Sequence, residues 1–232
     1  MAEKIKVEKS IFDRVIIEGK SVLRTFLACA VVLREKNKAY FYHQNLTLLR
    51  NLYIEAIENS RRGICVARQD TFSSKKEYLL GDLEKLSTLG LVDRFNQNKA
   101  KFEVLLNKSA YSKCILPSRH YITIEISLLS EISCEALNLL CYLLLNGKSQ
   151  SIKVKDFLKI IYKKNFNKFC FDKGLEKLKK EFFMVGYVIN FKRIKDGKKI
   201  TELGITLERT KKEKTKEYLQ AQTRSYEGSA TF

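Results

Sequence analysis

The chain has 232 residues, a length that allows one large domain or two small ones. Hydrophobic residues make up 45% of it, including 14 Phe and 11 Tyr, which excludes a chain that is disordered by composition. Its 44 lysines and arginines outnumber 26 acidic residues, and the formal net charge of +18 favours a polyanionic partner, with nucleic acid as the leading candidate.

Residues 1–110 predict three helices followed by a β-hairpin. The apolar spacing and the turn residues place the helices at 22–32, 46–57 and 75–88, and the strands at 91–95 and 101–105. Ser73 or Ser74 can cap the start of the third helix, and Gly90 suits the C′ position after its end. Residues 96–98 (Asn-Gln-Asn) are expected to join the two strands.

Pro117 is the only proline, and residues 111–120 around it show no helical periodicity. This stretch separates two segments of similar length, so we place a linker there. The expected organisation is an N-terminal domain at 1–112, a linker at 113–120, a C-terminal domain at 121–210 and a polar tail at 211–232.

Residues 121–210 repeat the same order of elements. After a strand at 121–124, the pattern predicts helices at 134–145, 154–162 and 169–183, a short extended piece at 151–154, and strands at 187–192 and 199–203. Asn146-Gly147 stops the first helix, and Asp196-Gly197 is a strong hairpin signal, because both residues tolerate positive φ. Helix, helix, helix, hairpin is the winged-helix plan. The predicted fold class is therefore α+β, with two tandem winged-helix domains.

The positive charge is concentrated in the second half, where residues 148–199 hold 16 basic and 5 acidic residues. On the predicted helix at 169–183, Phe171, Leu175, Leu178 and Phe182 share one face, and lysines occupy the opposite face. Such a helix can enter the major groove of DNA while the hairpin behind it reaches a phosphate backbone. The predicted DNA-binding residues of this half are Lys163, Lys164, Lys168, Lys173, Lys177, Lys180, Lys192, Arg193, Lys195, Lys198 and Lys199. A simple solvated helix face is the alternative interpretation.

The corresponding helix of the first half carries mainly hydroxyls and only one charge on its outward face. Ser74, Tyr78 and Lys85 point outward there, and the hairpin that follows adds Arg94, Lys99 and Lys101. Two roles stay open for this half: DNA contact through these six residues, and formation of a homodimer through its N-terminal helix.

Three segments of the second half resemble the C-terminal winged helix of plasmid replication initiator (Rep) proteins. They are the third helix and hairpin, at 169–178 (FCFDKGLEKL) and 195–207 (KDGKKITELGITL), and the earlier helix at 136–144 (ALNLLCYLL). The resemblance covers residues 121–208 and extends to residues 12–110 only in element order. The chain departs from the family pattern because its third helix lacks an acidic-Ile-Asn motif.

The resemblance implies a replication initiator that binds repeated origin sequences in double-stranded DNA and opens an AT-rich region. It also implies recruitment of host replication proteins and repression of the initiator's own promoter. In such a protein the C-terminal domain makes the main DNA contacts, and the N-terminal domain shares in DNA binding and mediates dimers. Two alternatives remain: a winged-helix transcriptional regulator that binds an operator, and a tandem winged-helix scaffold that binds acidic protein partners.

No motif predicts an enzyme. Gly19-Lys20-Ser21 and Gly147-Lys148-Ser149 lack the earlier glycine of a phosphate-binding loop, and His43 and His120 stand alone. The six cysteines have no metal-ligand spacing and are expected to be buried thiols, so we expect no catalytic residue, metal or cofactor. With no signal peptide and no apolar run long enough to span a membrane, a cytoplasmic location is expected.

Overall fold

The computed structural model describes residues 4–36, 40–41, 76–98, 101–117, 120–161, 168–197 and 199–210. The helices in this part of the chain are α1 (Lys9–Val15), α2 (Val22–Lys36), α4 (Lys76–Thr88), α5 (Lys108–Ile115), α6 (Leu128–Glu131), α7 (Cys134–Asn146), α8 (Val154–Ile160) and α9 (Lys168–Met184). The strands are β1 (Lys4–Glu8), β2 (Tyr40–Phe41), β3 (Val92–Asn98), β4 (Lys101–Leu106), β5 (Tyr121–Glu125), β6 (Ser149–Lys153), β7 (Tyr187–Asp196) and β8 (Lys199–Arg209). The predicted helix at 46–57, the caps Ser73 and Ser74, and the tail at 211–232 lie outside the described residues.

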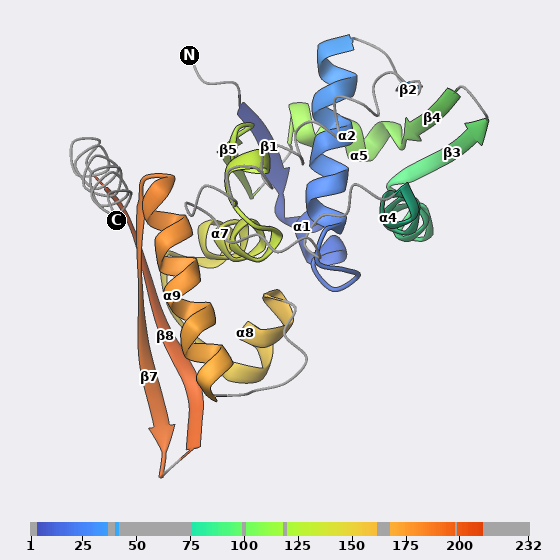
Figure 1. Ribbon diagram of the computed structural model, residues 1–232. Helices are drawn as coiled ribbons and strands as arrows, with labels where there is room; N and C mark the ends of the chain where they lie inside the picture. The colour runs from blue at the N-terminus through green and yellow to red at the C-terminus, as the bar shows by residue number, and fades with distance from the viewer. Residues whose placement is uncertain are drawn as a thin grey trace, which may run out of the picture.

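The two halves of the chain have the same sheet topology (Figure 1). One antiparallel sheet has the order β2-β4-β3 and the other has the order β6-β8-β7, so in each the first strand pairs with the last. A helix precedes the first strand of each sheet, α2 in one and α7 in the other, and a second helix, α4 or α9, leads into the hairpin. The fold is α+β, built from two tandem winged-helix units.

Local sequence signals set the ends of α7. The Ser133 side chain accepts a hydrogen bond from the Ala136 backbone N–H at the start of the helix. Gly147 follows the last turn with a φ of 123°, a conformation that a residue with a Cβ rarely adopts. Between these ends most of the helix is apolar, and ten of its residues are buried, Glu135 and Asn138 among them. A helix that is hydrophobic on all sides must lie inside the core.

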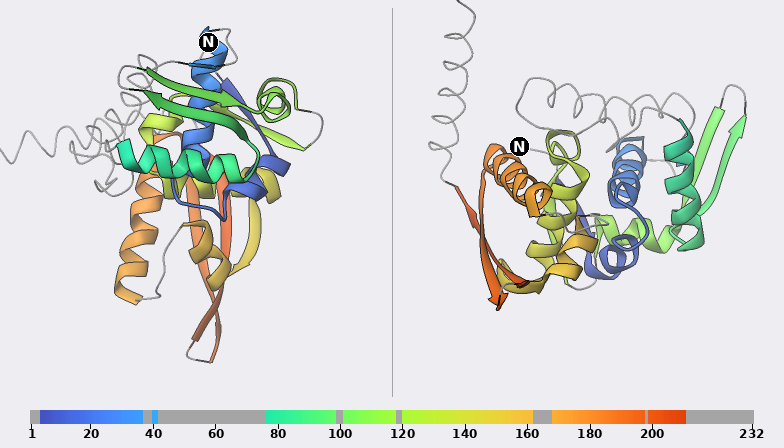
Figure 2. Two further views of the ribbon diagram at one scale, coloured as in Figure 1. Left: turned by 90° about the vertical axis from the view of Figure 1, so that its right-hand side faces the viewer. Right: turned by 60° about the horizontal axis from the view of Figure 1, so that its bottom comes forward.

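Helix α7 does lie between the two winged-helix units, as the right-hand view of Figure 2 shows. It packs against α1 and α2 on one side and against α8 and α9 on the other. The buried apolar side chains of both units therefore form one continuous cluster, from Ile5 near the N-terminus to Leu207 in β8. Because α7 packs against both units, it fixes the orientation of α9 and its hairpin relative to the first unit.

The structure differs from the sequence-based prediction at the junction between the two halves in two ways. Strand β5 pairs antiparallel with β1, with Ile5 opposite Ile124, so the N-terminal residues join the start of the second half. The stretch predicted to lack helical structure contains the end of α5, which runs to Ile115. Asn107 caps this helix by accepting hydrogen bonds from the backbone N–H groups of Ser109 and Ala110.

The strand lengths in the first hairpin also differ from the prediction. Residues 96–98 continue β3 instead of forming the turn, and Asn98 pairs with Lys101 in β4. In the second half, α8 ends at Ile160, two residues before the predicted end, and the strands of the hairpin continue past the predicted ends at 192 and 203 to Asp196 and Arg209. Both hairpins and both leading helices are otherwise present where the sequence predicts them.

Four cysteines, at positions 29, 114, 134 and 141, are buried free thiols, as the sequence predicts. Burial raises the pKa of Cys29, Cys114 and Cys141 to about 12. Because the thiolate is the reactive form, we expect these thiols to resist iodoacetamide at pH 8 in the folded protein and to react after unfolding in urea. Mass spectrometry of the digested protein measures this. Rapid alkylation of any of the four thiols in the native state would contradict the described packing.

Candidate nucleic-acid interface

Helix α9 has a buried apolar face and a polar outer face. Phe171, Leu175, Leu178 and Phe182 are all buried, as their spacing predicts, and Phe171 stacks edge-on against Phe157 of α8 with ring centroids 6.0 Å apart. The helix ends where Gly186 adopts a φ of 81°, and the chain then turns directly into β7. The core contacts of α9 therefore fix which side of the helix faces outward.

The outer face of α9 carries cations, although it is not wholly cationic. Lys173 and Lys180 are exposed. Lys179 is partly exposed and forms an ion pair with the exposed Glu176, with 2.7 Å between Nζ and Oε1. Lys168 is the first residue of α9 but its side chain is not described, and Lys163 and Lys164 lie outside the described residues.

Lys177 is turned toward the junction between the two units. Its Nζ lies 3.3 Å from Oε1 of Glu181, a side chain that is 1% exposed. This ion pair lacks the alignment of a hydrogen bond, so Oε1 accepts none within the described part of the chain. The other carboxylate oxygen accepts hydrogen bonds from the backbone N–H and the hydroxyl of Ser133, at 3.0 and 2.6 Å. Lys177 thus has a contact with a buried carboxylate, whereas Lys173 and Lys180 are exposed.

More buried charges lie at the same junction. Burial alone would raise the pKa of the Glu135 carboxyl, but Lys20 and Lys177 together bring its pKa below the ordinary value. The Lys20 Nζ lies 2.7 Å from Glu135 Oε1, and the buried Arg24 of α2 donates a hydrogen bond to the Ile132 carbonyl. These charges join α2, α7 and α9, so they hold the first unit against the second.

Strands β7 and β8 form a long hairpin, here called the wing, that extends beyond the rest of the protein (Figures 1 and 2). Gly197 turns its tip with a φ of 56°. The charged residues Lys192, Arg193, Lys195 and Lys199 are exposed on it, whereas Lys198 lies outside the described residues. Arg193 forms an ion pair with Asp172 of α9, so the wing is joined to the N-terminal part of that helix.

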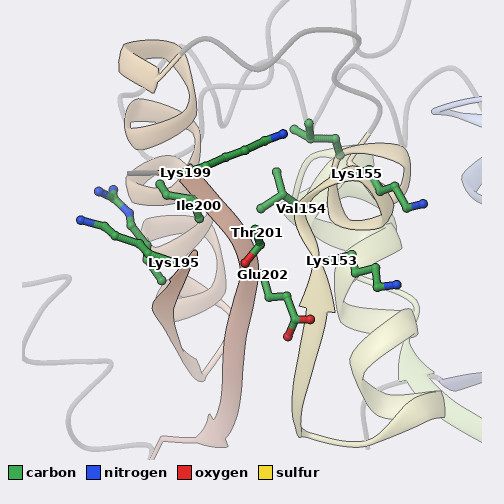
Figure 3. A pocket seen from close by; sticks show the side chains of 10 residues that line it. Lys153, Val154, Lys155, Lys195, Lys199, Ile200, Thr201 and Glu202 are labelled. Atoms are coloured by element: carbon green, nitrogen blue, oxygen red, sulfur yellow. The ribbon is translucent and has the colours of Figure 1, made fainter. Parts of the chain in front are cut away.

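A groove of about 790 Å³ lies beside the outer half of the wing, where β6 ends and α8 begins. We call it the wing groove. Its cationic lining residues are Lys153, Lys155, Arg193, Lys195 and Lys199, and its apolar ones are Val154, Leu158 and Ile200. In Figure 3, Lys199 reaches from β8 toward α8, whereas the side chains of Lys153 and Lys155 point away from the wing and that of Lys195 points away on the opposite side.

Glu202 is the single carboxylate among the residues that line the wing groove. Its side chain points away from Lys199 in Figure 3, and Ser151 of β6 donates a hydrogen bond to its Oε2 at 2.6 Å. With five cations and one carboxylate, the residues that line the groove carry a net positive charge.

Lys153 and Lys155 were missed at the sequence level. Their i, i+2 spacing at a strand-to-helix junction is a weak signal. What places them opposite the wing is the pairing of Lys153 with Glu202 between β6 and β8. That pairing joins residues 49 positions apart, and short-range patterns do not specify it.

Of the six residues predicted in the first half, two, Lys85 and Arg94, have described side chains. Lys85 is exposed on α4, but its Nζ lies beside Gly19 in the loop before α2. Arg94 is exposed on β3. Ser74 and Lys99 lie outside the described residues, and the side chains of Tyr78 in α4 and Lys101 in β4 are not described. DNA contact by this half therefore stays a prediction.

Two further searches covered only the described residues. They contain no group of three or more His, Cys, Asp or Glu side chains arranged to hold a metal ion. Among their helices, none combines the length and the apolar character needed to cross a membrane.

Comparison with known proteins adds one line of support for the fold. No protein-family model matches the sequence, and no curated protein matches it. Among solved structures, the chain is similar to the crystal structure of Pi initiator protein in complex with iteron DNA. The likeness covers 90% of this chain and 98% of that chain, with a TM-score of 0.51 and 13% sequence identity. This agrees with the tandem winged-helix architecture that the sequence predicts.

Proposed function

We propose that this protein binds double-stranded DNA sequence-specifically and acts as a replication initiator of the plasmid or phage type. The observation that carries the proposal is the joined cationic surface of α9 and the wing. Lys173 and Lys180 are exposed on the helix, and Lys192, Lys195 and Lys199 are exposed on the hairpin that Arg193 ties to Asp172. A helix flanked by a basic hairpin has the shape and charge to bind a DNA groove and its phosphates.

In the proposed complex the outer face of α9 reads base edges in the major groove, and lysines on both sides anchor phosphates. The anchoring residues are Lys164, Lys168, Lys192, Arg193, Lys195, Lys198 and Lys199. This function requires no covalent chemistry and no cofactor. The initiator role is supported by the similarity of the fold to an initiator solved with iteron DNA, and by the sequence resemblance to plasmid initiators.

Nuclease footprinting over the DNA that flanks the gene tests the proposal. We expect protection of several direct repeats beside an AT-rich tract, because an initiator assembles on repeated sites. Protection of one inverted repeat would instead indicate a transcriptional regulator with the same fold. The protein concentration is first raised to the level at which the protein saturates a nonspecific duplex. If no site in the flanking DNA is protected at that concentration, the proposal of sequence-specific binding is wrong.

A further inference from the structure

Strand β7 is an edge strand of its sheet. The strand order β6-β8-β7 places it at one border, where it pairs with β8 along one side (Figure 1). Within the described part of the chain, no strand pairs with its second side, although β7 is ten residues long. An edge of this length presents a row of backbone N–H and C=O groups that can pair with another extended chain.

One hydrogen bond identifies the backbone groups that β7 directs away from the sheet. The Thr210 N–H donates to the Gly186 carbonyl at 2.9 Å where the β7–β8 ladder begins, so these two residues form a hydrogen-bonded pair. Such pairs alternate along an antiparallel ladder, so every second residue from Val188 onward bonds to β8. On the other side of β8, the Leu207 N–H donates to the Lys148 carbonyl at 2.7 Å, as this alternation requires. The outward backbone groups are therefore those of Tyr187, Ile189, Phe191 and Arg193.

The side chains of β7 change in character along the strand. The buried Ile189 lies between the half-buried Tyr187 and Phe191, on the face where the Phe191 ring stacks edge-on against Phe157 of α8 at 5.9 Å. Residues 192–196, toward the tip of the wing, are all exposed, and three of these five are cations. A strand added beside β7 would therefore meet a partly open apolar row at one end and positive charge at the other.

Charge and hydrogen-bonding capacity decide which kind of chain fits this edge. A second copy of β7 would bring its own three cations to the same border, and lysines on an edge strand oppose such pairing. Opposite charges on neighbouring strands stabilise a pair instead. A DNA backbone has phosphate acceptors but no donors for the outward carbonyls of β7, whereas a polypeptide has both groups at the required spacing. The edge therefore fits an acidic polypeptide.

We propose that β7 accepts an extended acidic segment of a protein partner as an additional antiparallel strand. The outward backbone groups of β7 pair with the segment, which gives affinity without a deep pocket. Apolar side chains of the segment cover the open parts of Tyr187 and Phe191, and its carboxylates lie beside Lys192 and Lys195. The segment therefore carries Asp or Glu at its N-terminal end, followed by alternating apolar residues. This docking site goes beyond the proposed function and does not depend on it.

Amide hydrogen exchange of the full chain, followed by NMR, tests this assignment. The probe is a synthetic peptide of about ten residues, the length of a long strand, in which glutamates precede alternating valines and threonines. In the chain alone, we expect slow exchange at Val188 and Asn190, which bond to β8, and fast exchange at Tyr187, Phe191 and Arg193. With the peptide at about 1 mM, a concentration that detects even weak binding, exchange at the latter three should slow by about tenfold or more.

Five results would overturn the proposal. Slow exchange of the outward amides in the chain alone would mean that the edge is already covered, and slowing that increases with protein concentration would indicate a second copy. No slowing with the peptide, or equal slowing with lysines in place of its glutamates, would refute the acidic segment. Equal slowing with duplex DNA would indicate a nucleic-acid contact.

A pair of variants at one position isolates the backbone pairing. Arg193→Pro removes an outward N–H and leaves the hydrogen bonds to β8 in place, and Arg193→Ala is the matched control. Both variants lose the same cation and the same ion pair with Asp172, so they differ in the backbone. We expect the peptide to bind the proline variant about tenfold more weakly than the alanine variant. Equal affinities would overturn strand addition, and the exchange experiment decides the question if the proline variant does not fold. Failure of the docking site leaves the proposed function standing, because the lysines of α9 take no part in it.

Discussion

The double variant Lys173→Glu/Lys180→Glu is expected to bind duplex DNA on the order of 100-fold more weakly than the native chain. Both lysines are exposed on the outer face of α9, where a bound duplex would bring its phosphates close. Reversing two charges removes two attractions and adds two repulsions. Fluorescence anisotropy with a labelled mixed-sequence duplex measures the change. Lys177 is left intact, because its contact with Glu181 would mix an effect on stability with an effect on binding.

The control for this charge reversal is Lys148→Glu/Arg209→Glu, at the end of the sheet far from the tip of the wing. Arg209 lies 3.8 Å from Glu125, but an exposed ion pair of this kind contributes little to stability. It changes the net charge by the same amount, so the general loss of attraction to DNA is equal in the two variants. We expect at least tenfold weaker binding by the α9 variant than by the control. Equal affinities would show that α9 does not contact DNA.

Removal of a buried carboxylate at the junction should have the largest effect on stability. Glu181→Ala leaves the N–H and the hydroxyl of Ser133 without their acceptor and leaves the Lys177 ammonium without its ion pair. Each buried donor left without its acceptor costs about 1–3 kcal/mol, so the two Ser133 groups together put the expected loss in the free energy of unfolding at about 2–5 kcal/mol. Urea denaturation followed by circular dichroism measures this loss.

Glu176→Ala is the matched control, because it makes the same substitution on the same helix. Its carboxylate is 64% exposed and pairs with Lys179 at the surface. Exposed ion pairs contribute little, so the expected change is within about 0.5 kcal/mol. A cost at Glu181 as small as the cost at Glu176 would mean that the junction charges do not stabilise the contact between the two units.

Most of the second winged-helix unit could be predicted from the sequence, because its signals are local. Helix α9 has four apolar residues at helical spacing, and all four are buried. Asp196-Gly197 lies at the tip of the wing, where Gly197 has the positive φ that the turn requires. Hairpins and amphipathic helices are specified by residues close in the chain, so a single sequence reveals them.

The parts that could not be predicted depend on contacts between distant residues. The β1–β5 pairing joins strands more than 100 residues apart, and short strands of this kind carry no local signal for their partner. Helix α5 could have been found from Asn107, a favourable N-cap, but the weak apolar pattern that follows hid it. The wing groove depends on the register of β6 and β8, and the orientation of Lys177 depends on the buried Glu181.

The salt dependence of duplex binding tests the central claim most directly. A cationic surface formed by α9 and the wing that neutralises six or more phosphates predicts a slope of log affinity against log salt of about −5 or steeper. The corresponding loss of affinity between about 50 and 200 mM salt is about a thousandfold. A slope shallower than about −1, or no binding to any duplex at low salt, would contradict the account and favour a scaffold for protein partners.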